Sequence, residues 1–128
     1  MSSTLFTPYK LGPVTLRNRT IRSAAFESMG KDFGPTRQLK DYHVAVARGG
    51  VGMTTLAYAA VCRSGLSFNK QLWLRPEIVP GLREITDAVH REGAAAAIQI
   101  GHCGNMTHWT TAGQMPIGAS TGFNLYAY

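Results

Sequence analysis

The hydrophobic residues of this chain recur with two different spacings, and these predict helices and strands in alternation. Two segments carry apolar residues three and four positions apart, which is typical of a helix with one buried face. Short apolar runs between them are typical of strands covered on both faces. The predicted elements are a hairpin over about 9–16, strands over about 20–26, 51–57 and 97–100, helices over about 36–48 and 77–92, and a loop over 101–128.

Polar and glycine residues mark the boundaries of these elements. Thr36 is a suitable N-cap for the first helix, and Gly49-Gly50 follows its last turn. Gly93 ends the second helix, so the alanines at 94–97 are assigned to the following strand, although alanine favours helix. Strands that alternate with helices argue for a parallel sheet with right-handed crossovers, so the predicted fold class is α/β.

One amide stands inside the last predicted strand. Gln99 lies between Ile98 and Ile100, and an amide is costly to bury unless it has a hydrogen-bond partner. It offers donors and an acceptor, which suits a flat heterocycle carrying both kinds of group. Gly101 and Gly104 let the backbone approach a ligand beyond the strand, at the end where parallel α/β folds bind ligands. A satisfied core amide beside a loop is the alternative interpretation.

Small residues stand at the end of the first predicted strand. Ser23, Ala24 and Ala25 would let a planar ligand lie against the backbone. Ordinary close packing at a strand end explains the same residues equally well, so they indicate a ligand site only in combination with other features.

Composition and charge narrow the function classes. The 128 residues include 13 Lys and Arg against 7 acidic residues, a net charge of +6. These charges are dispersed along the chain, which favours a solvated surface over a nucleic-acid site. No apolar run is long enough to span a bilayer, and two cysteines are too few for a disulfide framework, so we expect a cytoplasmic protein. His102, Cys103 and His108 match no zinc spacing, so we expect no metal.

A series of short motifs runs from residue 5 to residue 104. In order, they are Leu5-Phe6, Leu11-Gly12, Leu16-Arg17-Asn18-Arg19, Arg22-Ser23-Ala24, Tyr42, Ala47-Arg48-Gly49-Gly50-Val51-Gly52, Pro80-Gly81-Leu82, Ala88-Val89-His90, Gly93-Ala94 and Gln99-Ile100-Gly101-His102-Cys103-Gly104. No one motif is specific, but the ordered set resembles the Old Yellow Enzyme family of FMN-dependent oxidoreductases, which includes 2,4-dienoyl-CoA reductases and ene-reductases. The resemblance implies a (β/α)8 TIM barrel. Residues 1–128 would form its N-terminal three-eighths, with the N-terminal β-hairpin as a cap at the bottom.

The resemblance also implies a cofactor site. FMN would be the cofactor, NAD(P)H the reductant and an activated alkene the acceptor. The residues that would meet FMN are Ser23, Ala24, Ala25 and Phe26 after the first strand, Ala57 and Tyr58 after the second, and Gln99 on the third. The Gln99 amide would bond the pyrimidine edge of the flavin. Glu27 and His102 would lie on the substrate side.

The resemblance sets limits on some of these roles. His102 would not hold the substrate carbonyl, because it follows the third predicted strand, whereas the family's His-x-x-His or His-x-x-Asn pair follows the fourth. Many members carry a Thr or Cys that tunes the flavin after the first strand, whereas this chain has Phe26 and then Glu27. A small residue is usual where Tyr58 stands. These departures concern the redox tuning and the shape of the pocket.

We expect these residues to need the rest of the barrel. Such a barrel takes about 250 residues to close, and the resemblance puts the substrate-holding pair, a Tyr proton donor and the flavin phosphate site beyond residue 128. The remaining strands would come from a second chain or from a segment outside this sequence, and the barrel could form a homo-oligomer. We expect no nucleic-acid or membrane partner. The rival interpretations are a non-catalytic α/β interaction module without flavin and a nucleic-acid binder that uses the net charge.

Overall fold

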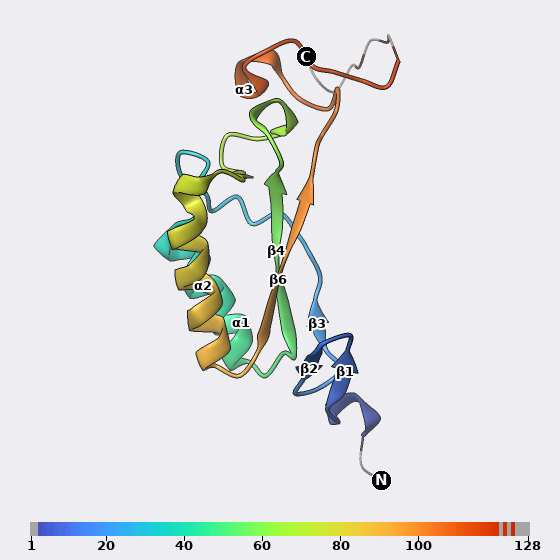
Figure 1. Ribbon diagram of the computed structural model, residues 1–128, viewed down its shortest axis with the longest axis vertical. Coiled ribbons are helices and arrows are strands. Elements are labelled where there is room, and N and C mark those ends of the chain that lie inside the picture. The colour runs from blue at the N-terminus through green and yellow to red at the C-terminus, as the bar shows by residue number, and fades with distance from the viewer. Residues whose placement is uncertain (1–2, 121, 123, 125–128) are drawn as a thin grey trace.

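The computed structural model describes residues 3–120, 122 and 124, and its elements are named as in Figure 1. In chain order they are the 3-10 helix η1 (Thr4–Phe6), the strands β1 (Tyr9–Leu11), β2 (Val14–Leu16) and β3 (Ile21–Arg22), the helix α1 (Arg37–Arg48), β4 (Met53–Ala60), η2 (Arg63–Gly65), β5 (Leu72–Trp73), η3 (Pro76–Ile78), α2 (Val79–Arg91), β6 (Ala95–Gly101) and α3 (Trp109–Ala112). Strands and helices alternate, as the α/β prediction requires.

The main sheet is parallel and is built around β4. β6 pairs along almost the whole of β4, from Met53↔Ala95 to Ala60↔Gly101. The opposite edge of β4 is shared, because β3 pairs with its first residues and β5 with its last. All these strands therefore run in the same direction. The carboxyl ends of β4 and β6 lie at the upper end of the sheet in Figure 1, whereas β3 pairs only at the lower end.

α1 forms because its sequence supplies both a cap and an apolar face. The Thr36 side chain accepts a hydrogen bond from the backbone N–H of Leu39 at 3.2 Å, which satisfies one of the free donors of the first turn. Leu39, His43 and Ala47 are four residues apart and all buried, so one face of the helix meets the sheet.

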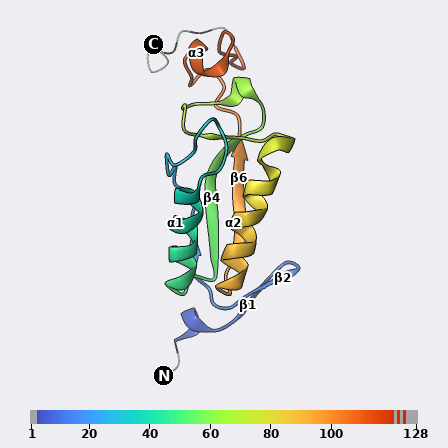
Figure 2. The same ribbon diagram turned by 90° about the vertical axis from the view of Figure 1, so that its left-hand side faces the viewer.

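α2 packs beside α1 on the same face of the sheet, as Figure 2 shows. Its buried residues are Ile85, Ala88 and Val89. Gly93 follows the helix at φ 77°, a left-handed conformation that favours glycine, and this turn sends the chain into β6. The core lies between the two helices and the sheet, and consists of Leu39, Ala47, Leu56, Ala59, Leu72, Ile85, Val89 and Ala94.

Arg17 ties together the C-terminal ends of both helices, at the end of the sheet where the strands begin. Its Nε donates to the carbonyl of Val51 at 3.0 Å, and its Nη1 donates to the carbonyl of Glu92 at 2.7 Å. Its Nη2 donates to the carbonyl of Ala47. Carbonyls at helix ends lack partners within the helix and favour a cation, so one guanidinium satisfies both ends.

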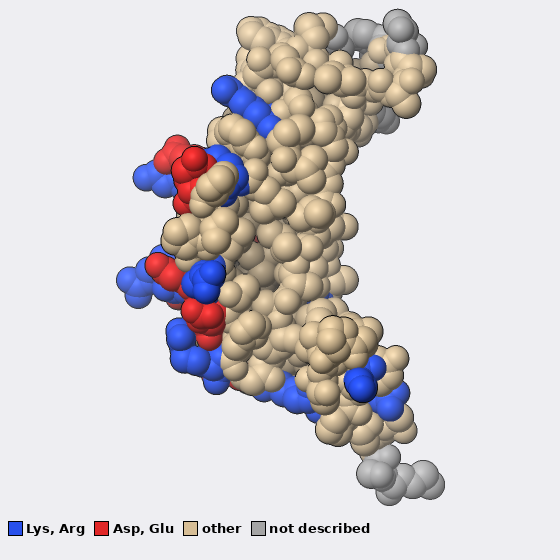
Figure 3. Space-filling view, viewed as in Figure 1, with Lys and Arg blue, Asp and Glu red and all other residues tan. Residues whose placement is uncertain are grey.

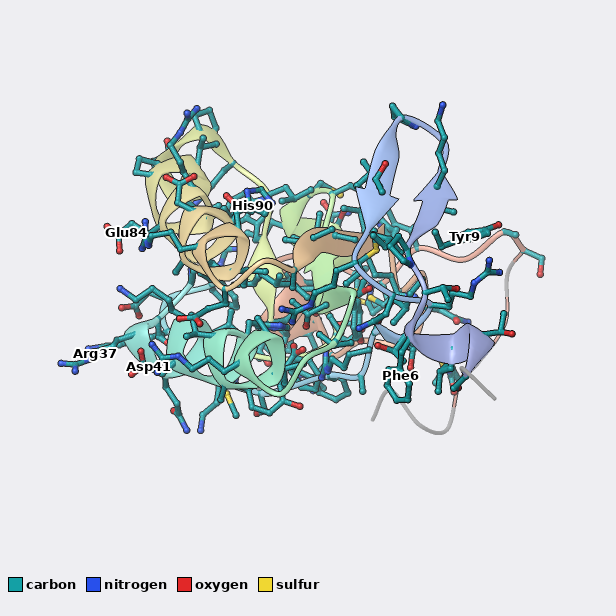
Figure 4. All side chains as sticks on the ribbon, turned by 90° about the horizontal axis from the view of Figure 1, so that it is seen from below. Phe6, Tyr9, Arg37, Asp41, Glu84 and His90 are labelled. Carbon is teal, nitrogen blue, oxygen red and sulfur yellow. The ribbon has the colours of Figure 1, made fainter. Side chains whose placement is uncertain are left out.

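The surface is unevenly charged. Figure 3 shows Lys, Arg, Asp and Glu gathered over α1 and α2, and Lys and Arg alone around the hairpin, while the right-hand margin between the two ends of the molecule is largely uncharged and hollowed. Seen from below, the β1–β2 hairpin lies across the sheet from the helices, and Arg37, Asp41 and Glu84 point away from the helices (Figure 4). Within the described part of the chain, no helix combines the length and hydropathy that crossing a membrane requires.

The first strand is much shorter than the sequence predicts. The expected strand over 20–26 contains only two ladder residues, Ile21 and Arg22, and residues 23–30 form no regular element. The other predicted strands are longer in the structure, as β4 continues to Ala60 and β6 begins at Ala95. β5 and α3 are absent from the prediction because two and four residues are too few to give a periodic signal.

Candidate functional site

A cavity of about 370 Å³ opens at the carboxyl ends of β4 and β6. Its lining residues are Tyr58, Ser67, Gln99, Ile100, Gly101, His102, Cys103 and Met106. They come from the ends of two adjacent parallel strands and the loops that follow, which is where α/β proteins place ligands. Two of the residues predicted to bind the cofactor, Tyr58 and Gln99, are brought together here, together with His102 from the predicted substrate side.

Gln99 is exposed, not a core amide. Ile98, its neighbour in β6, packs against the core under the helices, so the alternation of the strand turns Gln99 to the opposite face. The amide forms no hydrogen bond with any other described residue. The alternative of a satisfied core amide is therefore wrong, and the donors and acceptor of Gln99 are available to a ligand.

A register irregularity lies directly opposite Gln99. The ladder pairs Leu56 with Ile98 and then Ala59 with Ile100, so Ala57 and Tyr58 together face the single residue Gln99. Such a bulge re-aims side chains and is frequent beside functional sites. Here it leaves Ala57 buried and Tyr58 half-buried at the cavity.

Aromatic rings extend the wall beside Tyr58. The ring of Phe26 lies 5.7 Å from that of Tyr58, tilted by 60°, and stacks on Phe68 at 4.9 Å. Phe26 comes from the segment after β3 and Phe68 from the loop before β5, so the contact brings three parts of the chain together. Phe68 was not predicted as a site residue, because an isolated aromatic in a loop carries no periodic signal. These rings form an apolar cluster beside the cavity.

The predicted cofactor segment 23–26 runs beside β4 without joining its ladder. Ser23 and Ala25 are exposed, and Ala24 and Phe26 are half-buried. None of the four lines the cavity that contains Gln99, and Phe26 reaches it only through its contact with Tyr58. Ser23, Ala24 and Ala25 have small side chains, the property from which the sequence predicts close approach of a planar ligand, whereas the side chain of Phe26 is large.

Glu27 does not present its carboxylate to the cavity, in contrast to the expected substrate-side position. Its side chain is 3% exposed and holds a close ion pair with Arg22, Oε1 to Nη1 at 2.6 Å. Oε2 accepts the backbone N–H of Ala57 at 3.2 Å. Oε1 also lies 3.3 Å from Nε2 of His43, close enough for an ion pair although not directed as a well-formed hydrogen bond. Sequence reasoning missed this pairing because its partners lie on three different elements.

The charge of Glu27 is stabilised by these neighbours. Burial by itself would raise the pKa of the carboxyl, but interaction with the His43 ring and the positive charge of Arg22 outweigh it, and the pKa is lowered. His43 is held on its other side by Thr54, Nδ1 to Oγ1 at 2.8 Å. His43 lies on the buried face of α1, with Leu39 and Ala47.

His102 is exposed at the cavity and is engaged at both ring nitrogens. Nδ1 accepts the backbone N–H of Gly104 at 2.9 Å, and Nε2 lies 3.3 Å from Oγ of Ser64. The hydroxyl of Ser64 lies in turn 3.1 Å from Sγ of Cys62. Gly65 permits this arrangement, because a Cβ at that position would lie 2.9 Å from Cδ2 of His102. Among the described residues, no three His, Cys, Asp or Glu side chains converge as a metal site.

Comparison with known sequences identifies the family. The profile of the NADH:flavin oxidoreductase / NADH oxidase family matches residues 4–127. The 4,4'-dithiodibutanoate disulfide reductase of Rhodococcus erythropolis is 48% identical over 100 residues, which cover 78% of this chain and 25% of that protein. A probable N-methylproline demethylase of Rhizobium meliloti is 45% identical over 115 residues, which cover 88% of this chain and 17% of that protein. The chain spans a quarter or less of the length of these two relatives.

Solved structures agree with this match. An Old Yellow Enzyme homologue from Zymomonas mobilis superposes with a TM-score of 0.85 at 24% identity, over 94% of this chain and 34% of that chain. Morphinone reductase in complex with tetrahydroNAD superposes with a TM-score of 0.80 at 25% identity, over 90% and 32%. These likenesses confirm the predicted fold class, the N-terminal part of a (β/α)8 TIM barrel. The chain belongs to the NADH:flavin oxidoreductase / NADH oxidase family, the Old Yellow Enzyme family that its motifs indicate.

Proposed function

We propose that this chain provides part of the FMN site of an oxidoreductase that passes hydride from NAD(P)H to an activated alkene. The proposal rests on the position of the Gln99 amide. This side chain lines the cavity and forms no hydrogen bond with any other described residue. The pyrimidine edge of a flavin carries both hydrogen-bond donors and acceptors, so an amide can donate to it and accept from it. The family match supports FMN as the cofactor and a nicotinamide as the reductant.

The segment after β3, which lies outside the cavity that contains Gln99, also suits a flat ring system. The small side chains of Ser23, Ala24 and Ala25 leave the backbone accessible to a planar group. The stacked rings of Phe26 and Phe68 offer an apolar flank that excludes water. When bound, FMN would supply the hydride chemistry, and the chain's own residues would bind it, orient it and shield it.

The working site needs more strands than these residues provide. Within the described residues, β6 is paired only on the edge that faces β4, so its second edge is open. An unpaired edge of a parallel sheet exposes backbone N–H and C=O groups that can pair with other chains, so stable domains usually pair or cover it. We propose that the remaining strands, on a second chain or a further segment, complete the barrel and carry the residues that hold the alkene. A cytoplasmic location remains part of this proposal.

Flavin content is the direct test. The protein is purified with the remaining barrel strands, and its visible absorbance is measured before and after addition of FMN. We expect the flavin absorbance band, quenching of free FMN fluorescence on binding, and oxidation of NAD(P)H when an enone is added. A folded, colourless protein that takes up no FMN would contradict the proposal and support an interaction module without flavin.

A further inference from the structure

We propose that Glu27 is a positioning residue for the cofactor, because its pair with Arg22 replaces two backbone hydrogen bonds of the sheet and so frees the backbone N–H and carbonyl of Ala24. This inference rests on the proposed FMN site. It concerns residues that do not line the cavity themselves and act through the segment that precedes Glu27.

The register of β3 against β4 defines what the pair replaces. The ladder pairs Ile21 with Met53 and Arg22 with Thr54. If it continued at this register, the next two groups of β4 facing β3 would be the carbonyl of Thr55 and the N–H of Ala57, and both would bond to the backbone of Ala24.

Side chains take these two positions instead. Nη1 of Arg22 donates to the carbonyl of Thr55 at 2.6 Å, and Oε2 of Glu27 accepts from the N–H of Ala57 at 3.2 Å. β4 therefore loses no hydrogen bond where the ladder stops, which matters because an unpaired buried backbone group is costly. Neither backbone group of Ala24 bonds to another described residue, so both remain available to a ligand.

The same pair fixes the shape of the freed segment. Arg22 and Glu27 stand at its two ends and are joined by the 2.6 Å contact between Nη1 and Oε1. Nη2 of Arg22 also donates to the carbonyl of Ala25 at 3.1 Å, so the guanidinium fixes a residue within the segment as well as its two ends. The guanidinium of Arg22 also lies over the ring of Tyr42, with its Cζ 5.1 Å from the ring centroid.

The pair is in turn held by α1. His43 is fully buried, lies 3.3 Å from Glu27 and is fixed by Thr54 on β4. The orientation of the Glu27 carboxylate is therefore set by a helix and a strand, both regular elements of the scaffold. This is the arrangement expected of a residue that preorganises a binding segment, because its own position does not depend on a loop.

The test uses the FMN-binding protein with its complete barrel and two variants, Glu27→Gln and the double variant Arg22→Met/Glu27→Met. The Kd for FMN is measured by fluorescence quenching, the environment of the ring by the visible spectrum, and the free energy of unfolding on the apoprotein. Glu27→Gln keeps the size of the side chain but cannot accept from both Arg22 and Ala57. We expect it to raise the Kd for FMN by about 10- to 100-fold, to alter the visible spectrum and to lower stability.

The double variant separates positioning from simple stabilisation. With both side chains removed, the backbone of Ala24 can rejoin the ladder, so we expect stability to recover toward wild type while FMN binding stays weak. Recovery of FMN affinity in step with stability, recovery of neither, or an unchanged Kd in Glu27→Gln would each overturn the inference. Arg17→Met, at the opposite end of the strands, is the control: it should lower stability and leave the spectrum of bound FMN unchanged. A wild-type protein that binds no FMN would instead overturn the proposed function itself.

Discussion

Nε2 of His43 lies 3.3 Å from Oε1 of Glu27, and the two side chains are only 0% and 3% exposed. Because the pKa of Glu27 is lowered in the folded protein, the unfolded chain takes up a proton at this residue first as the pH falls. The stability that the carboxylate contributes is complete above its unfolded pKa, about 4.3. It is lost as the pH falls through the lower, folded value.

The direction of this pH dependence gives the first prediction. The free energy of unfolding of the wild type should exceed that of Glu27→Gln at pH 7, and the difference should shrink on acidification below about pH 4.3. Urea unfolding of both proteins from neutral pH to the acid limit measures it. Parallel curves over this range would show that the carboxylate is not the group that titrates.

The second prediction concerns the amide in the cavity. Gln99→Leu should weaken FMN binding by roughly 1–3 kcal/mol, because it leaves polar atoms of the cofactor against an apolar side chain. Gln38→Leu is the matched control, as Gln38 is exposed on α1 and lines no part of the cavity. Titration of the apoproteins with FMN compares them. Equal affinity in Gln99→Leu and wild type would remove Gln99 from the site.

The third prediction concerns His102. Its two ring nitrogens are occupied by Gly104 and Ser64, so the ring shapes the loop and has no free group for a substrate carbonyl. His102→Ala should therefore keep its flavin and change the turnover of an enone by less than about tenfold, or 1.4 kcal/mol. Steady-state NAD(P)H oxidation measures this. A loss of several orders of magnitude with flavin still bound would assign the carbonyl to His102 after all.

The fourth prediction tests the link between the helix ends. Arg17→Met removes three hydrogen bonds from a charged donor to backbone carbonyls and should lower the free energy of unfolding by about 2–4 kcal/mol. Arg19→Met is the comparison, because Arg19 is exposed and its side chain makes one long hydrogen bond, to Thr7, and lies over the Tyr9 ring, so the substitution should cost less than about 1 kcal/mol. Denaturant unfolding distinguishes the two, and similar losses would argue against a special role for Arg17.

Regular elements could be predicted from the sequence because their signals are local. Thr36 caps α1 as its side chain and position indicate, and Gly93 separates α2 from a strand that alanine propensity alone would have made helical. The hairpin around Gly12 is likewise encoded in adjacent residues. Each of these features depends on residues a few positions apart, which is the range over which periodicity and capping act.

The environment of Glu27 could not be predicted in this way. Arg22, His43 and Ala57 are spread over three elements, and nothing in the local sequence indicates that a carboxylate will take over a backbone hydrogen bond. The same long-range effect explains why the first strand stops at Arg22 although the apolar pattern continues. Gln99 lies near the carboxyl end of the last strand, as predicted, but it is exposed and not buried, because no described helix covers that face of the sheet.

The bulge opposite Gln99 means that β4 has one residue more than its core face requires, and that this extra residue lies at the cavity. Leu56 and Ala59 both face the helices although they are three residues apart, which strict alternation would not allow. Exchanging Ala57 or Tyr58 for another residue preserves this phase. Deleting either one would regularise the ladder: Leu56 and Ala59 would stand two positions apart, Ala59 would stay opposite Ile100, and a single residue would face Gln99. Such a deletion would keep the core and change the wall of the cavity beside Gln99.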